Sequence, residues 1–171
     1  MKLRRSVVVL SMCVTALALL PLGAQGRARK TQFDTPVQGT TSHGTFKGRL
    51  TVQGFRLKGS QVVATGELVG TLRDSRFPSA QHIDQSSTRL PVIADGGGSC
   101  SKLVLVYPET DIPVQDIRTH TRRQTVTVRA SGANRKIEAN VICGIQGLVA
   151  AAPSANAPLV HLLNALFELQ R

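Results

Sequence analysis

The chain has 171 residues, with 21 Lys and Arg against 10 Asp and Glu, and its formal net charge is +11. It contains no Trp, one Tyr and five Phe, which leaves few aromatic platforms of the kind that stack on bases or sugars. The positive excess favours contact with anionic partners, although a basic surface that serves only solubility fits the same composition.

The first 26 residues have the organisation of a secretory signal peptide. Basic residues precede an apolar stretch over 7–20, and the small residues Ala24 and Gly26 follow it. The apolar stretch is shorter than the roughly 20 residues that a membrane-spanning helix needs. We predict a cleavable signal over 1–26, cut after Gly26, and a secreted or envelope protein without a transmembrane segment. The basic segment holds a twin-arginine pair, but the residues after it fit the general secretory route better.

Residues 27–44 are polar and rich in Thr and Gln, which predicts a flexible leader ahead of one domain over 45–171. The domain opens with residues that alternate between apolar or small and polar, as in a half-buried strand. A change of parity at Gly54 predicts a bulge, and a turn at "KGS" leads into a second alternating strand. The side chains predicted to face inward are Phe46, Gly48, Leu50, Val52, Phe55, Leu57, Val62, Ala64, Gly66, Leu68, Gly70 and Leu72.

The middle of the chain predicts further antiparallel strands. Residues 74–87 indicate an irregular excursion, and 88–94 a short strand that Pro91 places at an edge. The segment 102–107 is apolar at consecutive positions, which indicates an inner strand. Two prolines and several charges leave open whether 107–119 forms a regular strand. The segment "QTVTVRA" alternates again, with Val126, Val128 and Ala130 inward.

Two helices are predicted at the C-terminal end. Apolar residues over 141–149 recur at helical spacing, with Asn140 as a candidate cap, and those over 159–167 follow the start signals Asn156 and Pro158. The second stripe could lie on a membrane, but its polar face lacks basic residues, so packing on a sheet is favoured. The predicted fold class is α+β: a five- to six-stranded, mainly antiparallel sheet, open to strong curvature, packed with one or two C-terminal helices.

Two cysteines, Cys100 and Cys143, remain after the predicted signal is removed. In an oxidising compartment an even pair is most simply a disulfide. Two buried thiols or a reactive cysteine are the alternatives. Neither residue has a nearby Cys or His of the kind a zinc site uses, and Cys143 lies between Ile142 and Ile145, unlike an exposed nucleophile.

Several of these segments share an order and spacing with other proteins. The matching residues are Phe46, Gly48, Leu50, Val52, Phe55, then Gly66, Leu68, Gly70, then Cys100, Leu103, Leu105, then "ANVICGIQGLV" and "HLLNAL". This order resembles a family of small exported bacterial proteins with an F-x-G-x-L hairpin, two cysteines and a C-terminal G-N-L-L-C-A-(V/I)-A-G-L-L motif. The resemblance covers most of 45–169 and implies export and this fold.

The resemblance brings no catalytic residues. Where that family carries a Leu-rich stretch after its first cysteine strand, this chain reads "YPETDIPVQDI", in which charges replace leucines. If the stretch lines an apolar site in the family, the site is altered here.

The sequence lacks recognised catalytic motifs, and we predict a protein that is not an enzyme and needs no cofactor or metal. The close His–carboxylate pairs, His82 with Asp84 and His120 with Asp116, lie in polar segments and are expected to be solvated. Export argues against nucleic acid as the partner and favours anionic envelope polymers or lipid headgroups.

The predicted function is a cell-envelope or extracellular binding or structural module with a basic surface. An alternative is a carrier that encloses an apolar ligand between the sheet and the C-terminal helices, a reading that the small residues on the hairpin's inner face favour slightly. Those small residues equally allow close packing of a helix. The candidate contacts for an anionic surface are Lys47, Arg49, Arg56, Lys58, Arg73, Arg122 and Arg123.

Overall fold

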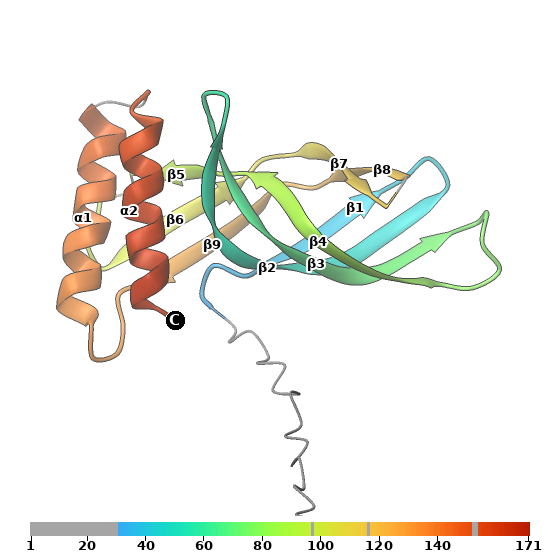
Figure 1. The fold of residues 1–171 in the computed structure, drawn as a ribbon, viewed down its shortest axis with the longest axis horizontal. Coiled ribbons are helices and arrows are strands. Elements are labelled where there is room, and N and C mark those ends of the chain that lie inside the picture. Colours follow the sequence, from blue (N-terminus) through green and yellow to red (C-terminus); the bar gives the residue numbers. More distant parts are fainter. Residues whose placement is uncertain (1–30, 97, 116, 152–153) are drawn as a thin grey trace, which may run out of the picture.

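The computed structural model describes residues 31–96, 98–115, 117–151 and 154–171, so the predicted signal lies outside the described part. Within these ranges, nine strands form two antiparallel sheets and two helices follow at the C-terminal end (Figure 1). This arrangement confirms the predicted α+β class, with more strands than the five or six expected.

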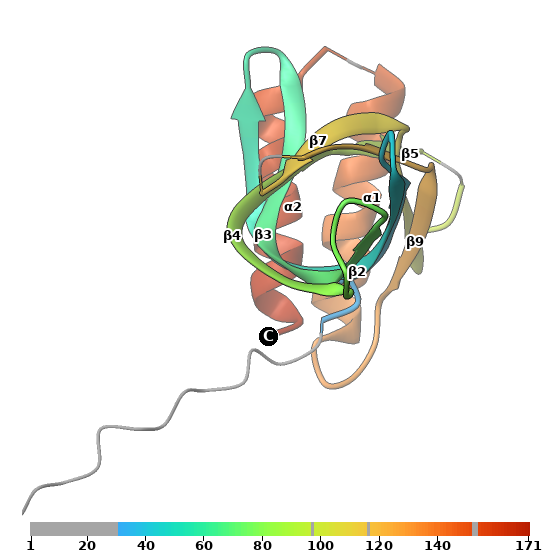
Figure 2. The same cartoon turned by 90° about the vertical axis from the view of Figure 1, so that its right-hand side faces the viewer.

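Sheet A has six strands in the order β4-β3-β2-β1-β8-β7. It curves so strongly that it forms a nearly closed ring when viewed along its length (Figure 2). The helices pack at one end of this ring, and the turns that connect β1 with β2 and β3 with β4 lie at the other (Figure 1). The strands are β1 (Thr35–Thr40), β2 (Gly44–Lys58), β3 (Gln61–Asp74), β4 (Gln81–Pro91), β7 (Thr110–Val114) and β8 (Ile117–Thr121).

The two edge strands of sheet A, β4 and β7, are joined by a side chain. Gln85 of β4 donates from Nε2 to the carbonyl oxygen of Pro113 at 3.1 Å, and its Oε1 accepts the Gln115 amide at 2.8 Å. Pro113 has no amide hydrogen to contribute to a ladder. The side-chain amide of Gln85 therefore links β4 to β7 at the place where backbone pairing between these two strands would close the ring.

The hairpin of β2 and β3 confirms the strongest sequence prediction. The strands pair antiparallel over their whole length, with an irregularity between Val52 and Gly54 where the parity change predicted a bulge. Gly59 has φ +62° in the connecting turn, a conformation that glycine adopts without steric cost. The inward prediction holds except at Leu57, which is 43% exposed.

The leader predicted for 27–44 is wrong for residues 35–40, which form β1. This strand pairs with β2 along its length and with β8 at Gly39 and Thr40. Its polar composition concealed an alternation that buries Thr35 and Val37. Just before it, the Phe33 side chain is fully buried. The strand is thus an inner strand of sheet A.

Sheet B has three strands in the order β5-β6-β9, and β6 is the inner strand that its apolar run predicted. The excursion predicted over 74–87 is shorter than expected, because β4 begins at Gln81. The stretch whose regularity was left open forms the antiparallel pair β7 and β8. The strands of sheet B are β5 (Ile93–Asp95), β6 (Lys102–Tyr107) and β9 (Gln124–Arg129).

Helices α1 (Arg135–Ala151) and α2 (Asn156–Leu169) lie side by side (Figure 1). The helix α2 contacts β2 and β3 of sheet A, and α1 contacts β5 and β6 of sheet B. The helix α1 begins earlier than predicted, and Asn140 is exposed inside it rather than at its cap. The buried carboxylate of Glu138, in the first turn, accepts the Ser131 amide at 2.7 Å and so ties this helix start to the preceding segment.

The apolar stripe of α2 packs inward, as predicted, with Leu159, Leu163, Leu166 and Phe167 buried. The Phe33 ring lies edge-on to the rings of Phe55 and Phe167, at centroid distances of 5.4 and 5.6 Å. Asn164 fixes the helix to β2, since it accepts the Phe55 amide at 2.8 Å and donates to the Phe55 carbonyl at 2.9 Å.

Cys100 and Cys143 lie at disulfide-bonding distance, with their Cα atoms 4.6 Å apart, which agrees with the predicted pair. Both residues are exposed. The bond joins the middle of α1 to the segment before β6. It therefore links the helical layer to sheet B.

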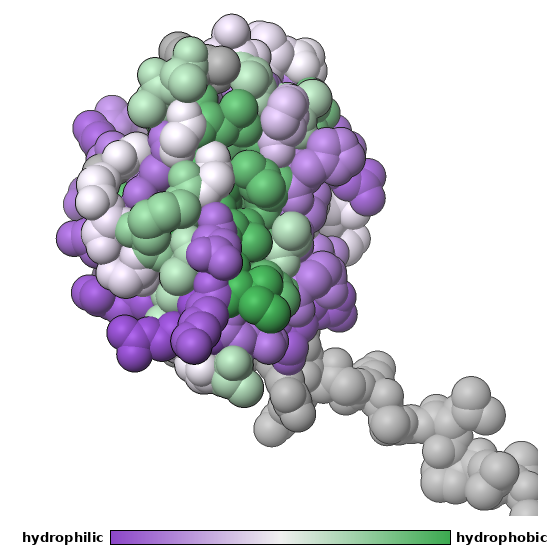
Figure 3. Space-filling view, turned by 90° about the vertical axis from the view of Figure 1, so that its left-hand side faces the viewer, coloured by the Kyte–Doolittle hydropathy of each residue, from purple (hydrophilic) through white to green (hydrophobic). Residues whose placement is uncertain are grey.

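The outer surface of the helix pair carries an apolar strip between polar flanks (Figure 3). Ile137 on this layer is 55% exposed, and Val141, Leu148 and Leu162 are partly buried against the core. Among the described helices, none is both long and apolar enough to cross a membrane.

Candidate functional site

Three of the predicted basic residues lie together on the outer face of β2 and β3. Lys47 and Arg49 are two residues apart on β2, so their side chains leave the same face about 7 Å apart. Arg73 of β3 pairs with Thr45, and Lys47 pairs with Thr71. Lys47 and Arg73 are therefore diagonal neighbours on that face.

A fourth basic residue reaches the same face from the other side. The Arg122 amide donates to the Gln38 carbonyl at 2.9 Å, and Gln38 pairs with Lys47 across β1 and β2. Arg122, which is exposed, thus lies two strand spacings from Lys47, or about 10 Å. We call Lys47, Arg49, Arg73 and Arg122 the basic face.

The basic face contains a surface depression, and few acidic side chains lie near its positive charges. No carboxylate in the described part of the chain forms an ion pair with one of its residues. The acidic residues nearest by register are Glu67, diagonal to Arg49, and Asp84, one strand further away. Both lie toward Arg49, so the charge of Lys47 and Arg73 in particular is available to a partner. A depression of about 350 Å³ on this face is lined by Thr45, Lys47, Thr71 and Arg73.

The structure does not bring the remaining predicted contacts into this cluster. Arg56 and Lys58 lie at the far end of β2, about 30 Å along the strand from Lys47. That end of the hairpin contacts α2, where the side-chain amide of Asn156 donates to the Ser60 carbonyl. Arg123 is exposed in the connection between β8 and β9, next to Arg122 but outside the strands.

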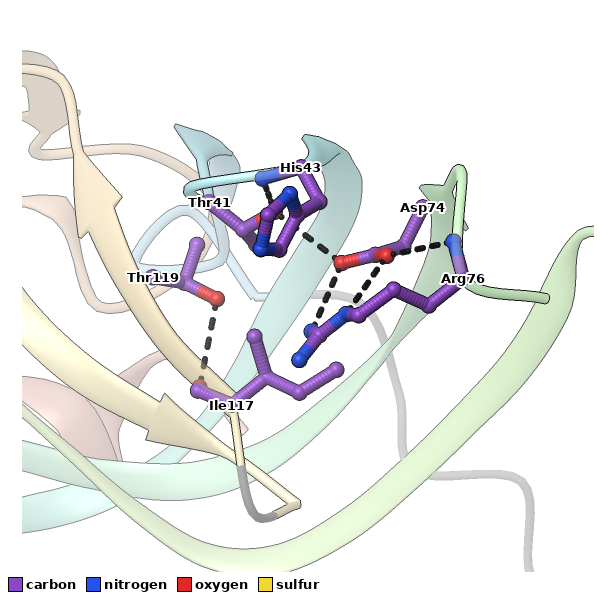
Figure 4. Close-up of polar contacts among 6 residues, drawn as sticks. All are labelled: Thr41, His43, Asp74, Arg76, Ile117 and Thr119. Carbon is purple, nitrogen blue, oxygen red and sulfur yellow. Dashed lines mark hydrogen bonds and ion pairs between the residues drawn. The ribbon is translucent and has the colours of Figure 1, made fainter.

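Sequence reasoning missed a charged cluster at the end of sheet A that faces away from the helices (Figure 4). The Asp74 carboxylate accepts Arg76 Nε and Nη2, each at 2.9 Å, and the Arg76 amide at 3.0 Å. Thr41 Oγ1 also donates to it at 3.2 Å, and accepts the His43 amide at 3.2 Å. Four donors thus hold one carboxylate whose side chain is fully buried, while Arg76 is 48% exposed.

The sequence held a signal for this cluster. Asp74 continues the inward parity of Leu68, Gly70 and Leu72 on β3. An inward charge needs a partner, and Arg76 follows two residues later. The hydrogen bonds from the Arg76 side chain hold the pKa of Asp74 well below its ordinary 3.8, although burial acts in the opposite direction. Asp74 in turn raises the pKa of Arg76.

The cluster borders an open depression of about 520 Å³, which we call the mouth. Its walls come from the β1–β2 turn, the segment after β3, and β7 with β8. Ile117 and Thr119 of β8 lie across from the Asp74–Arg76 pair (Figure 4). The lining residues are Thr40, Thr41, Ser42, Arg76, Asp111, Ile117, Arg118 and His120.

Among the described histidines, His120 lies in an exposed cluster with two carboxylates. His120 Nδ1 lies 2.9 Å from Asp111 Oδ1, and its Nε2 lies 4.0 Å from Glu109, all on an exposed surface. The sequence had pointed to Asp116 as the partner, a residue outside the described part. No group of three or more His, Cys, Asp or Glu among the described residues is placed to hold a metal ion.

Two of the small residues that allowed a carrier, Gly48 and Gly70, lie against the Phe46 ring. An added Cβ at Gly48 or at its partner Gly70 would lie 2.6 Å from Cζ of Phe46. These glycines therefore make room for the Phe46 ring inside sheet A rather than for a helix or a ligand. The carrier hypothesis places its ligand between the sheet and the C-terminal helices. The edge-to-face rings of Phe33, Phe55 and Phe167 lie in that region, between β2 and α2.

No family model, no curated protein and no solved structure matches the chain. The resemblance to small exported proteins therefore stays a prediction from the sequence motifs.

Proposed function

We propose that this chain is an exported, non-enzymatic binding module that contacts an anionic envelope polymer or lipid headgroups through the basic face. One observation carries the proposal: β1, β2, β3 and the end of β8 bring Lys47, Arg49, Arg73 and Arg122 to one hollowed surface, where no described carboxylate pairs with them. Strands hold these cations at fixed spacing, which suits a repeating anionic surface better than a single small anion.

The resemblance to exported proteins supports the compartment in this proposal, and so does the pairing of Cys100 with Cys143, because disulfides persist outside the cytoplasm. Export is tested separately by N-terminal sequencing of the protein from the culture medium or the cell envelope, where the mature chain should begin after Gly26. A chain that retains its first residues would contradict cleavage.

The direct test measures binding of the mature protein to phosphatidylglycerol vesicles and to a soluble poly(glycerol phosphate), with phosphatidylcholine vesicles as the neutral reference. Binding should weaken strongly between 0.1 M and 1 M salt, because the Debye length falls from about 10 to about 3 Å. The two anionic probes distinguish a lipid surface from a polymer.

The decisive variant replaces Lys47, Arg49 and Arg73 together by Gln. Near an anionic surface each cation contributes about 1 kcal/mol, so we expect a loss of about a hundredfold in affinity. The matched control replaces Arg129, Arg135 and Lys136, which are exposed on sheet B and the start of α1 and carry the same charge. Equal losses in both triples, or binding that salt does not change, would contradict a specific basic face.

A further inference from the structure

Arg76 at the mouth is held in place by Asp74 and still has N–H groups without a partner in that ion pair. A guanidinium has five N–H groups. Arg76 directs two of its side-chain nitrogens, Nε and Nη2, to Asp74, which leaves three N–H groups for another acceptor. The ion pair fixes the plane of the guanidinium, and the side chain is 48% exposed where it lines the mouth. A donor held in this way loses little conformational freedom when it binds an anion.

A second arginine and several hydroxyl groups face the same depression. Arg118 comes from β8, on the other side of the mouth from Arg76, and is exposed. Thr40 and Ser42 line the mouth from the end of β1 and the turn that follows it. Guanidinium groups with nearby hydroxyls are the donors that proteins use for phosphate oxygens.

The two carboxylates at the mouth differ in how far their hydrogen-bonding capacity is used. The Asp74 carboxylate receives four hydrogen bonds and is buried behind Arg76. Asp111, which lines the mouth, lies 2.9 Å from His120. Arg118 forms no ion pair with a described carboxylate. Apart from Asp111, whose side chain is 48% exposed, the described polar side chains that line the mouth can act as donors.

From this arrangement we propose that the mouth of sheet A is a binding site for a phosphate group, held between Arg76 and Arg118. The depression of about 520 Å³ is larger than one phosphate, so it has room for the organic part of a phosphate ester. The site uses none of the residues of the basic face, and the inference does not depend on the proposed function.

The test titrates the mature protein with inorganic phosphate and with glycerol 3-phosphate, at constant ionic strength set with chloride, and follows the arginine Nε–H resonances by NMR. We expect saturable shifts for Arg76 and Arg118 with both probes. Arg118→Gln should weaken binding about tenfold, which is the loss of one charge-assisted hydrogen bond. Non-saturable shifts, or equal shifts with chloride alone, would overturn the proposal.

Two further variants separate this site from others. Arg76→Lys keeps the charge but loses the planar fork, and should also weaken phosphate binding. If this variant fails to fold, Arg118→Gln still decides the question, because Arg118 is exposed. The triple variant of Lys47, Arg49 and Arg73 should bind glycerol 3-phosphate as tightly as the wild type. Binding lost in that triple but kept in Arg118→Gln would overturn the mouth site and leave the basic face in place.

Vesicles that contain phosphatidic acid distinguish a free ester from a lipid headgroup. If the mouth takes headgroups, glycerol 3-phosphate should compete with these vesicles, and Arg118→Gln should weaken vesicle binding. If it takes free esters, the ester binds in an Arg118-dependent manner without competing. Vesicle binding without any Arg118-dependent ester binding would contradict a phosphate site at the mouth.

Discussion

The two ends of sheet A are closed by different chemistry. At the helix end, the rings of Phe33, Phe55 and Phe167 pack edge-to-face and the neutral amide of Asn164 ties α2 to β2. At the far end, the Asp74–Arg76 ion pair borders the solvent-accessible depression at the mouth. Apolar packing stabilises a fold without preference for a partner, whereas partly exposed charges can also be shared with a ligand. Apolar packing at the helix end therefore serves stability, and the partly exposed charges at the far end support our proposal of a binding site there.

The largest expected effect is at the helix end, where Leu163→Asp should lower the free energy of unfolding by roughly 5 kcal/mol. It removes a fully buried apolar side chain and leaves a charge without a partner. Urea denaturation measures the change, and Leu163→Met is the matched control, expected to cost less than about 1.5 kcal/mol. A Leu163→Asp variant with wild-type stability but lost partner binding would mean that the stripe of α2 is an interaction face.

Reduction of the disulfide should have the next largest effect. A link across 43 residues restricts the unfolded chain by about 4 kcal/mol in the loop-entropy model. Both cysteines are exposed, so a reductant can reach the bond in the folded protein. Intact mass should rise by about two hydrogens on reduction, and the melting temperature should fall. Two alkylatable thiols in the native protein would contradict the bond.

Asn164→Ala should have a smaller effect. It deletes two hydrogen bonds to the Phe55 backbone, each of which contributes about 1 kcal/mol, so we expect a loss of about 2 kcal/mol. Asn140→Ala on α1 is the control, since Asn140 is exposed and makes no comparable contact in the described residues. Equal stability of the two variants would show that the clamp between α2 and β2 is not needed.

The last prediction concerns the mouth, where stability should depend on pH. The pKa of Asp74 is depressed in the fold, so its contribution is present above the ordinary 3.8 and is lost as the pH falls through the folded value. The difference in unfolding free energy between wild type and Asp74→Asn should be constant above about pH 5 and shrink below it. Parallel pH profiles would mean that the ion pair does not stabilise the charged form.

The sequence predicted those elements whose periodicity is regular and failed where composition concealed it. The hairpin of β2 and β3 and the packed face of α2 follow from clear spacing of apolar residues. The strand β1 was mistaken for a leader because its inward positions include Thr35 and Gly39, which do not look apolar. Its strand geometry depends on partners far along the chain, which no local pattern contains.

The candidate site was predicted in part for a related reason. Alternation placed Lys47, Arg49 and Arg73 on one outer face, because each belongs to a strand whose register could be inferred. The contribution of Arg122 depends on the pairing of β1 with β8, and so could not be inferred without the tertiary structure. The mouth joins residues from turns and from β8, where period-two patterning gives no guide to proximity.

The position of β1 also bears on how the chain folds in time. This strand lies between β2 and β8 in sheet A, and its pairing with β8 joins Gly39 to Thr121. The first hairpin can form as soon as its own residues meet, but the ring cannot be completed until a segment about 80 residues later arrives at β1. Non-local pairing of this kind slows folding, because the entropy of a long loop is lost before its contacts form. The edge of β1 that faces β8 stays unpaired during that interval, and an unpaired strand edge is where a folding chain is most exposed to association with another copy of itself.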